Sequence, residues 1–477
     1  MEDLVEFAAD FEQCLRVDYA EVRSQSDTRE TMMLKRGSLE ACMQEESKGI
    51  NVRVLVGGSL GFASTNVLTK KSVKKAVERA CALAQAGSKI LQSGVLMAKG
   101  ELGDEKVELK PRISFGNIDL ESKARLLKEA DKQTEVAAIE VGAKIVDRVL
   151  TLDTWTTEKI VITTDGAEVS SCIPRAAIHI LLTAYHPQKG SVQRSFDLGG
   201  TGGWETVEEW NLTQLLDAEA RSLSKTLLEA KKTPRREADL VLGPEVVGII
   251  CHESSGHPGE ADRILGREAA QAGETYLKAD SVGLRVGSRC VNVVDDPTVK
   301  GSFGFYRYDE EGVKARKRIL IKEGVINEFL QNRETASVFG VESNGSSRAV
   351  AYNREPIVRM ANTFLEPGDH SQEELLEDIK EGVYIKNFME WNIDDRRFNQ
   401  RYVGLEAYRI EDGELKDMLR NPVLEVTTVG LWSAVDAVGN DPQFQAAYCG
   451  KGDPMQAIPV WTGGPHIRLR EVKLGGA

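Results

Sequence analysis

The spacing of apolar residues predicts a first region of helices and strands, followed by a region that is mostly strands. Helical intervals between apolar residues alternate with strand-like stretches up to about residue 231. The predicted helices are 1–15, 69–92, 119–142 and about 205–231, and the predicted strands lie within 19–68 and 144–195. Between them the sequence predicts a loop at 93–118 and a glycine-rich turn at 197–203. Asp119 stands where a cap of the third helix is expected.

A charged stretch that contains a proline, residues 231–239, separates the two regions and predicts the main domain boundary. It divides the chain into an N-terminal α/β domain, 1–235, itself divisible into 1–110 and 111–235, and a C-terminal domain, 236–477. The predicted fold class is α+β, with antiparallel sheets and long helices in the first domain and mostly antiparallel strands in the second.

The C-terminal domain is predicted to begin with one strand and one helix and to continue as antiparallel strands. The strand at 238–243 leads to Pro244, whose fixed φ suits the first turn of a helix. Beyond about residue 275 the pattern predicts hairpins that turn at Glu323-Gly324 and Asp412-Gly413, and only 371–381 has helical spacing.

Composition and charge exclude several classes of protein. The chain has 477 residues, 41% of them apolar, and a formal net charge of −13, so it offers no overall basic footprint for nucleic acid or an anionic membrane. Its acidic amino-terminal segment lacks the features of a signal peptide, and its apolar runs are too short to span a bilayer. Seven scattered cysteines fit reduced thiols, so a cytoplasmic location is expected.

One motif carries chemistry: His252, Glu253 and His257 form the pattern H-E-x-x-x-H in a chain with only six histidines. Neutral imidazoles bind zinc, and an adjacent glutamate can act as general base on a zinc-activated water. The histidines of the better-known H-E-x-x-H helix share one face, whereas residues five apart on an α-helix lie about 140° apart. The motif therefore predicts a π-bulge near Gly256 or a helix that ends there.

Two protein ligands are too few for a catalytic zinc site, so a third is expected from elsewhere. Glu260 and Asp262 are close in sequence, and the remaining histidines and cysteines stay open. Cys449, in a glycine-rich segment near the carboxyl end, is the best distant candidate, although a cysteine taken alone is more often a small buried apolar group. Cys251 is left out because its side chain points about 100° away from that of His252 on a helix.

These residues favour a zinc peptidase that hydrolyses peptide bonds with Glu253 as general base. The alternative is a non-catalytic or regulatory subunit that binds a partner protein and whose metal is structural. A small basic cluster in the strand-rich domain, formed by Arg396, Arg397 and Arg401, is compatible with an acidic partner but is expected to face solvent.

The sequence resembles the TldD/PmbA metallopeptidases, a family also described as modulators of DNA gyrase. Residues 252–262, HESSGHPGEAD, are similar to the family signature H-E-x-x-x-H-x-x-E-A-D, and the blocks at 359–369 and 449–469 agree in order. Two departures are Pro258 after the second histidine and Gly-Lys-Gly-Asp-Pro after Cys449, where Asp-Gly-Gln is expected.

The resemblance implies a zinc peptidase with His252, His257 and Cys449 as ligands and Glu253 as the catalytic acid and base. It makes Glu260 a residue that orients a ligand imidazole. It also implies the motif-bearing subunit of a homodimer, or of a heterodimer with a zinc-free sister chain, which acts on small or unfolded peptides. From the net charge and the short apolar runs, neither nucleic acid nor a membrane is expected as a partner.

Overall fold

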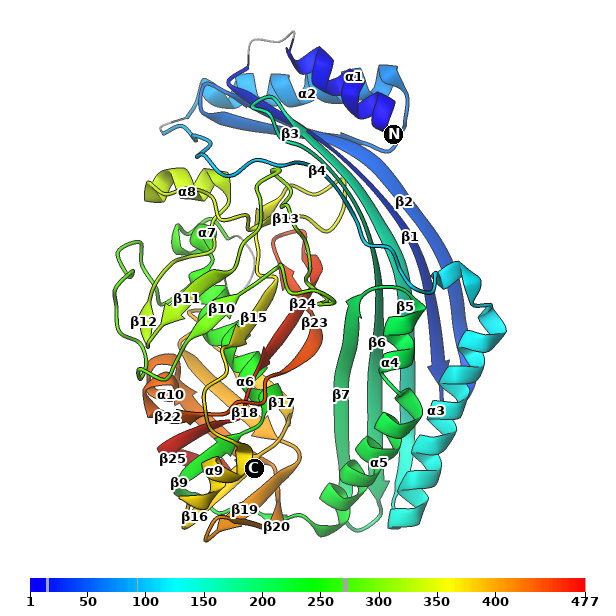
Figure 1. Ribbon diagram of the computed structural model, residues 1–477, viewed down its shortest axis with the longest axis vertical. Helices are drawn as coiled ribbons and strands as arrows, with labels where there is room; N and C mark the ends of the chain where they lie inside the picture. Colours follow the sequence, from blue (N-terminus) through cyan, green and yellow to red (C-terminus); the bar gives the residue numbers. More distant parts are fainter. Residues whose placement is uncertain (14–16, 92, 269–272, 477) are drawn as a thin grey trace.

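The computed structural model describes residues 1–13, 17–91, 93–268 and 273–476. A long, curved antiparallel sheet from the N-terminal half lies beside a C-terminal half in which several shorter strands surround one central helix (Figure 1). Both helices and strands are abundant and most strand pairs are antiparallel, which confirms the predicted α+β class.

The N-terminal half largely follows the predicted order of elements. Its helices are α1 (Glu2–Gln13), α2 (Lys70–Ser88), α3 (Leu120–Val141), α4 (Trp204–Glu209) and α5 (Leu212–Glu229). Its strands are β1 (Tyr19–Lys35), β2 (Ser38–Val56), β3 (Ser59–Thr65), β4 (Asp104–Glu108), β5 (Lys144–Thr163), β6 (Glu168–His186) and β7 (Gly190–Thr201). The ends of the first two predicted helices, residues 14–15 and 92, lie outside the described residues.

Local signals at α3 are confirmed, whereas three predictions nearby need correction. Asp119 caps α3, since its Oδ1 accepts a bond of 2.7 Å from the backbone N–H of Ser122. The predicted loop 93–118 contains β4, which pairs with β6. Most of the predicted glycine-rich turn, 197–201, belongs to β7 because it pairs with β6 to its end. The predicted helix 205–231 is two helices, α4 and α5, because Asn211 adopts a left-handed conformation between them.

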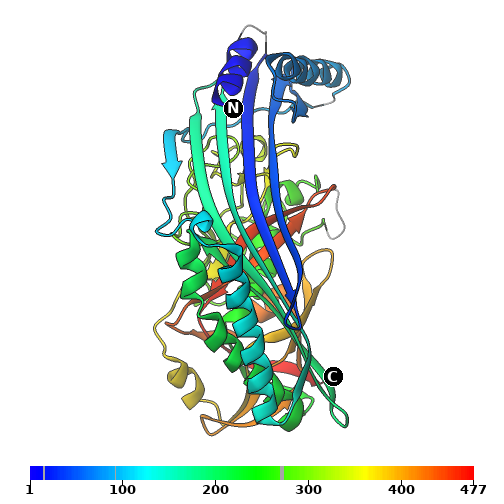
Figure 2. The same cartoon turned by 90° about the vertical axis from the view of Figure 1, so that its right-hand side faces the viewer.

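Helices α3 and α5 pack together over one face of the curved sheet, toward one end of its strands. Helices α1 and α2 lie at the opposite end of the sheet (Figure 2). The apolar side of α3 and α5 packs against the inward residues of β5, β6 and β7, which forms the main core of this half. In the described part of the chain, no helix has the length and apolar character needed to cross a membrane.

The C-terminal half holds more helices than the sequence predicts. They are α6 (Pro244–Cys251), α7 (Ala261–Ile264), α8 (Arg333–Phe339), α9 (Gln372–Glu377) and α10 (Thr428–Ala434). The prediction that only 371–381 is helical beyond residue 275 is wrong, because α8 and α10 are also helical. Each has only seven residues and begins after a side-chain cap, Asn332 for α8 and Thr427 for α10. Because a helix this short shows little hydrophobic periodicity, the sequence pattern did not reveal it.

The strands of this half form two sheets and a small separate pair. They are β8 (Lys231–Lys232), β9 (Arg236–Leu242), β10 (Val293–Asp295), β11 (Arg318–Lys322), β12 (Val325–Ile326), β13 (Ser347–Arg348), β14 (Ile357–Val358), β15 (Asn362–Leu365), β16 (Glu381–Ile385), β17 (Phe388–Ile393), β18 (Asn399–Gly404), β19 (Ala407–Glu411), β20 (Glu414–Arg420), β21 (Pro422–Thr427), β22 (Val435–Val438), β23 (Gln443–Lys451), β24 (Gln456–Gly464) and β25 (Ile467–Gly476). Both predicted hairpin turns are confirmed, at Glu323-Gly324 and Asp412-Gly413, where every φ is positive.

One sheet runs through both halves of the molecule. Strands β23 and β24 join the sheet of the N-terminal half through the pair of Ala446 in β23 and Asp197 in β7. On the other side, β24 pairs in parallel with β15. The central helix α6 packs against β15, β23 and β24, so the residues that follow α6 are held close to this junction.

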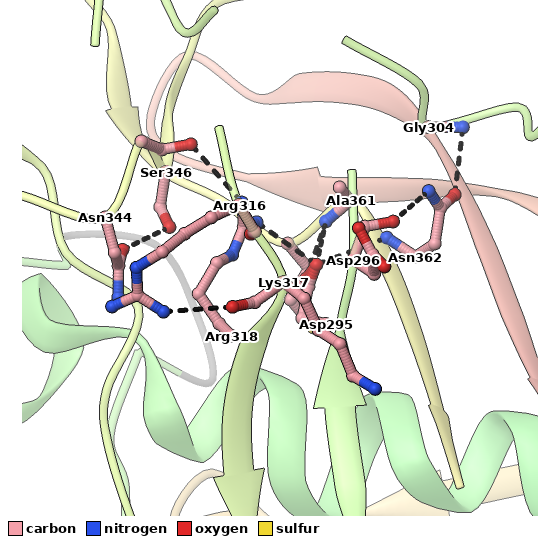
Figure 3. A network of polar contacts seen from close by, with 12 residues as sticks. Asp295, Asp296, Gly304, Arg316, Lys317, Arg318, Asn344, Ser346, Ala361 and Asn362 are labelled. Carbon is pink, nitrogen blue, oxygen red and sulfur yellow. Dashed lines mark hydrogen bonds and ion pairs between the residues drawn. The ribbon is translucent and has the colours of Figure 1, made fainter. Parts of the chain in front are cut away.

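A buried polar network fixes β15 beside β10 (Figure 3). Asp295 and Arg318 form an ion pair in which neither side chain has exposed surface, with 3.2 Å between Oδ1 and Nη2. Asp295 also accepts hydrogen bonds from the backbone N–H groups of Ala361 and Asn362, at 2.8 Å and 3.3 Å. Because breaking a buried ion pair leaves an uncompensated charge, this network holds Ala361 and the start of β15 in place.

Candidate metal centre

The turn after α6 winds as a π-helix over His252–Gly256, so of the two predicted alternatives, a π-bulge near Gly256 or a helix that ends there, the structure has the first. The backbone N–H of His257 donates to the carbonyl oxygen of His252, an i to i+5 bond. The wider turn removes the angular offset that an α-helix would give, so the two imidazole rings lie on the same side with centroids 4.9 Å apart. The five-residue spacing of the two histidines therefore matches the i to i+5 bonding of a π-helix.

Gly256 allows the π-helical turn to approach the neighbouring chain closely. A Cβ at this position would lie 1.9 Å from Sδ of Met360 and 3.3 Å from Oγ1 of Thr363, which is too close for any side chain without a shift. Met360 precedes the Ala361 and Asn362 amides that Asp295 binds. The buried network thus positions the surface against which the π-helix packs.

Cys449 comes to the two histidines from β23, 192 residues away from His257. Its Sγ lies 3.5 Å from Nε2 of His257, and one ligand atom from each of His252, His257 and Cys449 lies within 4.8 Å of the others. The guanidinium of Arg359 donates to the Cys449 carbonyl oxygen and, at 2.7 Å, to that of Gln456. These bonds hold the β23–β24 backbone where the thiol faces the histidines.

The three side chains fit a zinc ion in chemistry as well as in position. Burial lowers the pKa of both His252 and His257, which favours the neutral imidazole, the form that binds a metal ion. Burial alone would raise the pKa of the Cys449 thiol, but His257 and Arg359 together lower it to about 7, so thiolate is available near neutral pH. Among the described residues, the buried Nδ1 of His252 has no hydrogen-bond partner. Two nitrogens and one sulfur form a donor set that suits zinc.

The two acidic alternatives for the third ligand are engaged elsewhere. Glu260 lies 2.9 Å from Nδ1 of His257, which leaves Nε2 of that ring directed toward Cys449. Burial would raise the pKa of Glu260, but Lys451 and His257 outweigh it and hold that pKa well below its usual range. Asp262 accepts a bond of 2.6 Å from Nζ of the same Lys451. Glu260 is therefore placed to orient an imidazole, as the resemblance implies.

Glu253 lies in the same π-helical turn and is paired with an arginine that sequence reasoning assigned to solvent. Its Oε2 accepts a hydrogen bond from Nη1 of Arg397, and both side chains are buried. Arg396 is exposed and Arg401 is half-buried, so the expectation of a solvent-facing cluster is wrong for Arg397. In the part of the chain that the structure describes, Oε1 of Glu253 has no protein donor, so it is free to accept a proton.

The turn that carries Arg397 is bonded to Thr428 of α10 and, through Gln400, to Ser254 of the π-helix. Arg397 adopts φ 59°, and its carbonyl oxygen accepts a bond of 2.8 Å from Oγ1 of Thr428. Gln400, three residues later, donates to the same Thr428 oxygen and accepts a bond of 2.8 Å from Oγ of Ser254. These bonds fix the distance between the β17–β18 turn and Glu253.

Sequence reasoning missed two site residues, Arg397 and Lys451. For Lys451 a signal was present, because residues two apart in a strand share a face and Lys451 follows Cys449 by two. No periodic signal identifies Arg397, since it lies in a turn and reaches Glu253 only through the packing of β17 and β18.

Three family models match this chain in order along its length. They are described as PmbA/TldA metallopeptidase domain 1, central domain and C-terminal domain, and they match residues 20–84, 113–232 and 235–476. The chain belongs to this PmbA/TldD metallopeptidase family.

Relatives with curated names and solved structures agree with this membership. A metalloprotease of Methanocaldococcus jannaschii is 31% identical over 94% of this chain and 96% of its own length. A protein of Saccharolobus solfataricus named as a zinc metalloprotease TldD homolog is 33% identical over 54% of this chain and 56% of its own length. The crystal structure of TldE from Thermococcus kodakarensis matches this fold over all of both chains, with a TM-score of 0.74 and 18% identity. The protein is accordingly a metallopeptidase.

We predict that Cys449→Ala lowers the zinc content of the purified protein from about one ion per chain to a small fraction, because only two protein ligands remain. Elemental analysis after gel filtration measures this content. Cys290→Ala is the matched control, since Cys290 is exposed and its loss leaves zinc unchanged. Full zinc content in Cys449→Ala would show that the third ligand is another residue.

Proposed function

We propose that the protein is a zinc-dependent peptidase in which His252, His257 and Cys449 hold the ion and Glu253 is the general base. The observation that carries this proposal is the π-helical turn, which brings both histidines to one side and meets Cys449. A structural zinc site is closed by four protein ligands, whereas the group that the described residues form has three. Three ligands leave one coordination position for water or substrate.

The chain's own residues supply the proton transfers. A zinc ion bound there would lower the pKa of a bound water toward about 7 and polarise the scissile carbonyl. Glu253 takes a proton from the attacking water on its free Oε1 and gives it to the departing amine. Arg397 holds Oε2, so the carboxylate cannot rotate away from the site. Glu260 keeps the imidazole of His257 in one orientation.

The burial of the site supports small or unfolded peptides as substrates. His252, Glu253 and Cys449 are each 5% exposed or less. A compact protein cannot bring a peptide bond into such a site, whereas a flexible chain can enter in an extended form and pair with strands. A peptidase with this access tolerates many sequences and still spares folded proteins.

A free sheet edge supports assembly as a dimer, with itself or with a zinc-free sister chain. Strand β2 pairs with β1 along its whole length, but β3 covers only its residues 50–56. Residues 38–49 therefore form a sheet edge, on which Leu39 and Met43 are exposed. Uncovered edges of this kind readily pair with another chain.

We predict that Glu253→Gln keeps its zinc and loses peptidase activity by about 100-fold or more, because the amide preserves shape but cannot accept a proton. Zinc content and kcat for an unfolded peptide are measured on the same sample. Glu237→Gln, at an exposed position, is the matched control and keeps full activity. An unchanged kcat in Glu253→Gln would exclude this glutamate as the base.

We predict that Arg397→Met lowers kcat about tenfold or more, because hydrogen bonds to charged groups contribute roughly 1.5–3 kcal/mol. Because Arg397 acts on the orientation of Glu253, KM and zinc content stay unchanged, and Arg397→Lys restores part of kcat. Arg401→Met, at a half-buried neighbour, is the control.

Two results would contradict this positioning role for Arg397. One is equal activity of Arg397→Met and Arg401→Met. The other is a loss of activity that follows loss of zinc, since that would indicate damage to the metal site instead of a misplaced carboxylate.

We predict that the protein is a dimer by light scattering and that it degrades an unfolded protein much faster than the same protein when folded. Met43→Arg places a charge on the free edge of β2 and is expected to shift a homodimer toward monomer. Ile139→Arg, on the exposed side of α3, is the matched control.

A wild-type monomer that degrades both forms at equal rates would refute both the dimer and the preference for unfolded substrates, and it would leave the zinc chemistry untouched. If the wild type alone is monomeric but still spares the folded form, the zinc-free sister chain becomes the expected partner.

A further inference from the structure

A polar cavity of about 250 Å³ lies between the curved sheet and the C-terminal half. Its walls come from β1, β5 and β6 on one side and from the residues around Arg348 and the β23–β24 hairpin on the other. Tyr448 lines the cavity, and Cys449, next to it in β23, faces the histidines. Since successive residues of a strand point to opposite faces, the cavity and the metal site lie on opposite faces of one hairpin.

Two arginines line this cavity without a carboxylate to neutralise them. Arg175 donates to the carbonyl oxygens of Phe303 and Phe305, at 3.2 Å and 2.8 Å. Arg348 donates to those of Met360 and Pro459, at 2.6 Å and 3.0 Å. Both residues are buried, and within the described ranges no carboxylate oxygen lies within 4.0 Å of either guanidinium.

The remaining N–H groups of these arginines have no protein acceptor within the part of the chain described. A guanidinium has five N–H donors, and each of the two uses only some of them. The unused atoms are not among the side-chain atoms that are both fully buried and unbonded. They therefore keep some accessible surface, and both Arg175 and Arg348 belong to the lining of this cavity.

The charges around the cavity do not cancel. Glu310 is bound by Arg23 and by Lys159, so its negative charge is already matched by two cations. Asp27 accepts hydrogen bonds from Thr157 and Gln25. Arg29, Arg175 and Arg348 add three cations and Glu45 adds one carboxylate, so five cations stand against three carboxylates, which leaves two positive charges in excess around the cavity.

This arrangement destabilises the charged form of Arg175. Burial, and after it the nearby charge of Arg348, lower the pKa of Arg175 to about 10. Two buried cations that repel each other are stabilised by an anion placed between or beside them.

The cavity has an open side. Tyr448 is 40% exposed and Val350 is 37% exposed, and both belong to its lining, as do the exposed Glu45 and Ser47 of β2. Its volume is just below the roughly 300–1,000 Å³ of sites for drug-sized ligands. A small molecule can therefore enter, and a large one cannot.

We propose that this cavity is a binding site for the oxyanion group, carboxylate or phosphate, of a small molecule, which Arg175 and Arg348 bind behind the β23–β24 hairpin. The site is separate from the metal centre, and its occupation does not depend on peptide hydrolysis. Bidentate hydrogen bonds from guanidinium groups are the usual means of binding both kinds of oxyanion in proteins.

The test is calorimetric titration of the zinc-loaded protein, at constant ionic strength, with inorganic phosphate and with succinate. Succinamide, which has the same shape without charge, is the control ligand. The wild type is expected to bind one phosphate or one succinate per chain and no succinamide.

Val350→Glu adds a carboxylate at the mouth without removing a side-chain contact of either arginine, and it is expected to weaken anion binding about tenfold or more. Arg348→Gln is expected to do the same. Val338→Glu, at an exposed position of α8 outside the cavity lining, is the matched control. Tighter binding of phosphate than of succinate would identify a phosphate ligand, and the reverse order a carboxylate ligand.

The proposal fails if neither anion binds saturably, or if succinamide binds as well as succinate. It also fails if Val350→Glu binds as the wild type does while Cys449→Ala loses binding, because the anion would then occupy the metal centre. Peptidase activity is not a readout, so these results are independent of the proposed function.

Discussion

The i to i+5 hydrogen bond from the His257 backbone to the His252 carbonyl determines most of what the site can do. An α-helix would direct the two imidazoles about 140° apart. The π-helical turn places them side by side and keeps Glu253 within the same turn. A π-turn is less favourable than an α-turn and needs support from its surroundings. Here the support comes from close packing of Met360 against Gly256 and from a buried helix, α6, directly before it.

Buried charge joins the two halves of the molecule. Arg23 of β1 binds Glu310 at 2.8 Å, and Arg53 of β2 binds Glu311 at 2.6 Å, with almost no exposed surface on any of these side chains. Such pairs add little net stability, because the desolvation of both groups offsets their attraction. Breaking one pair, however, leaves a buried charge alone, so a wrongly docked arrangement of the halves is strongly disfavoured. These charges select one arrangement of the curved sheet relative to the C-terminal half.

The hairpin of β23 and β24 connects the main features of the molecule. It pairs with the sheets of both halves, through β7 and β15. One of its faces carries Cys449 to the histidines, and the other lines the cavity with Tyr448. Arg359 binds the backbone of both its strands, so these bonds hold the hairpin between the three candidate metal ligands and the cavity. Alternation along a single strand is thus sufficient to serve two chemically different environments.

Local features of the sequence determined the parts of this structure that depend on residues close together in the chain. The cap at Asp119 and the positive-φ turn at Glu323-Gly324 each follow from neighbouring residues. The five-residue spacing of the histidines likewise predicted that the helix bulges or ends near Gly256. The sequence also contained Cys449, but its approach to His257, 192 residues away, is a product of sheet pairing.

Tertiary structure alone decided which charges meet. Arg397 looks like one of several arginines in a polar turn, and it becomes the partner of Glu253 because the chain from Arg397 to Gln400 lies against the π-helix, where Gln400 also accepts a bond from Ser254. Arg175 and Arg348 have no pattern in common, yet both line one cavity. The physical reason is that periodicity and capping report the energetics of nearby residues, whereas the pairing of buried charges depends on distances set by the complete packing of the chain.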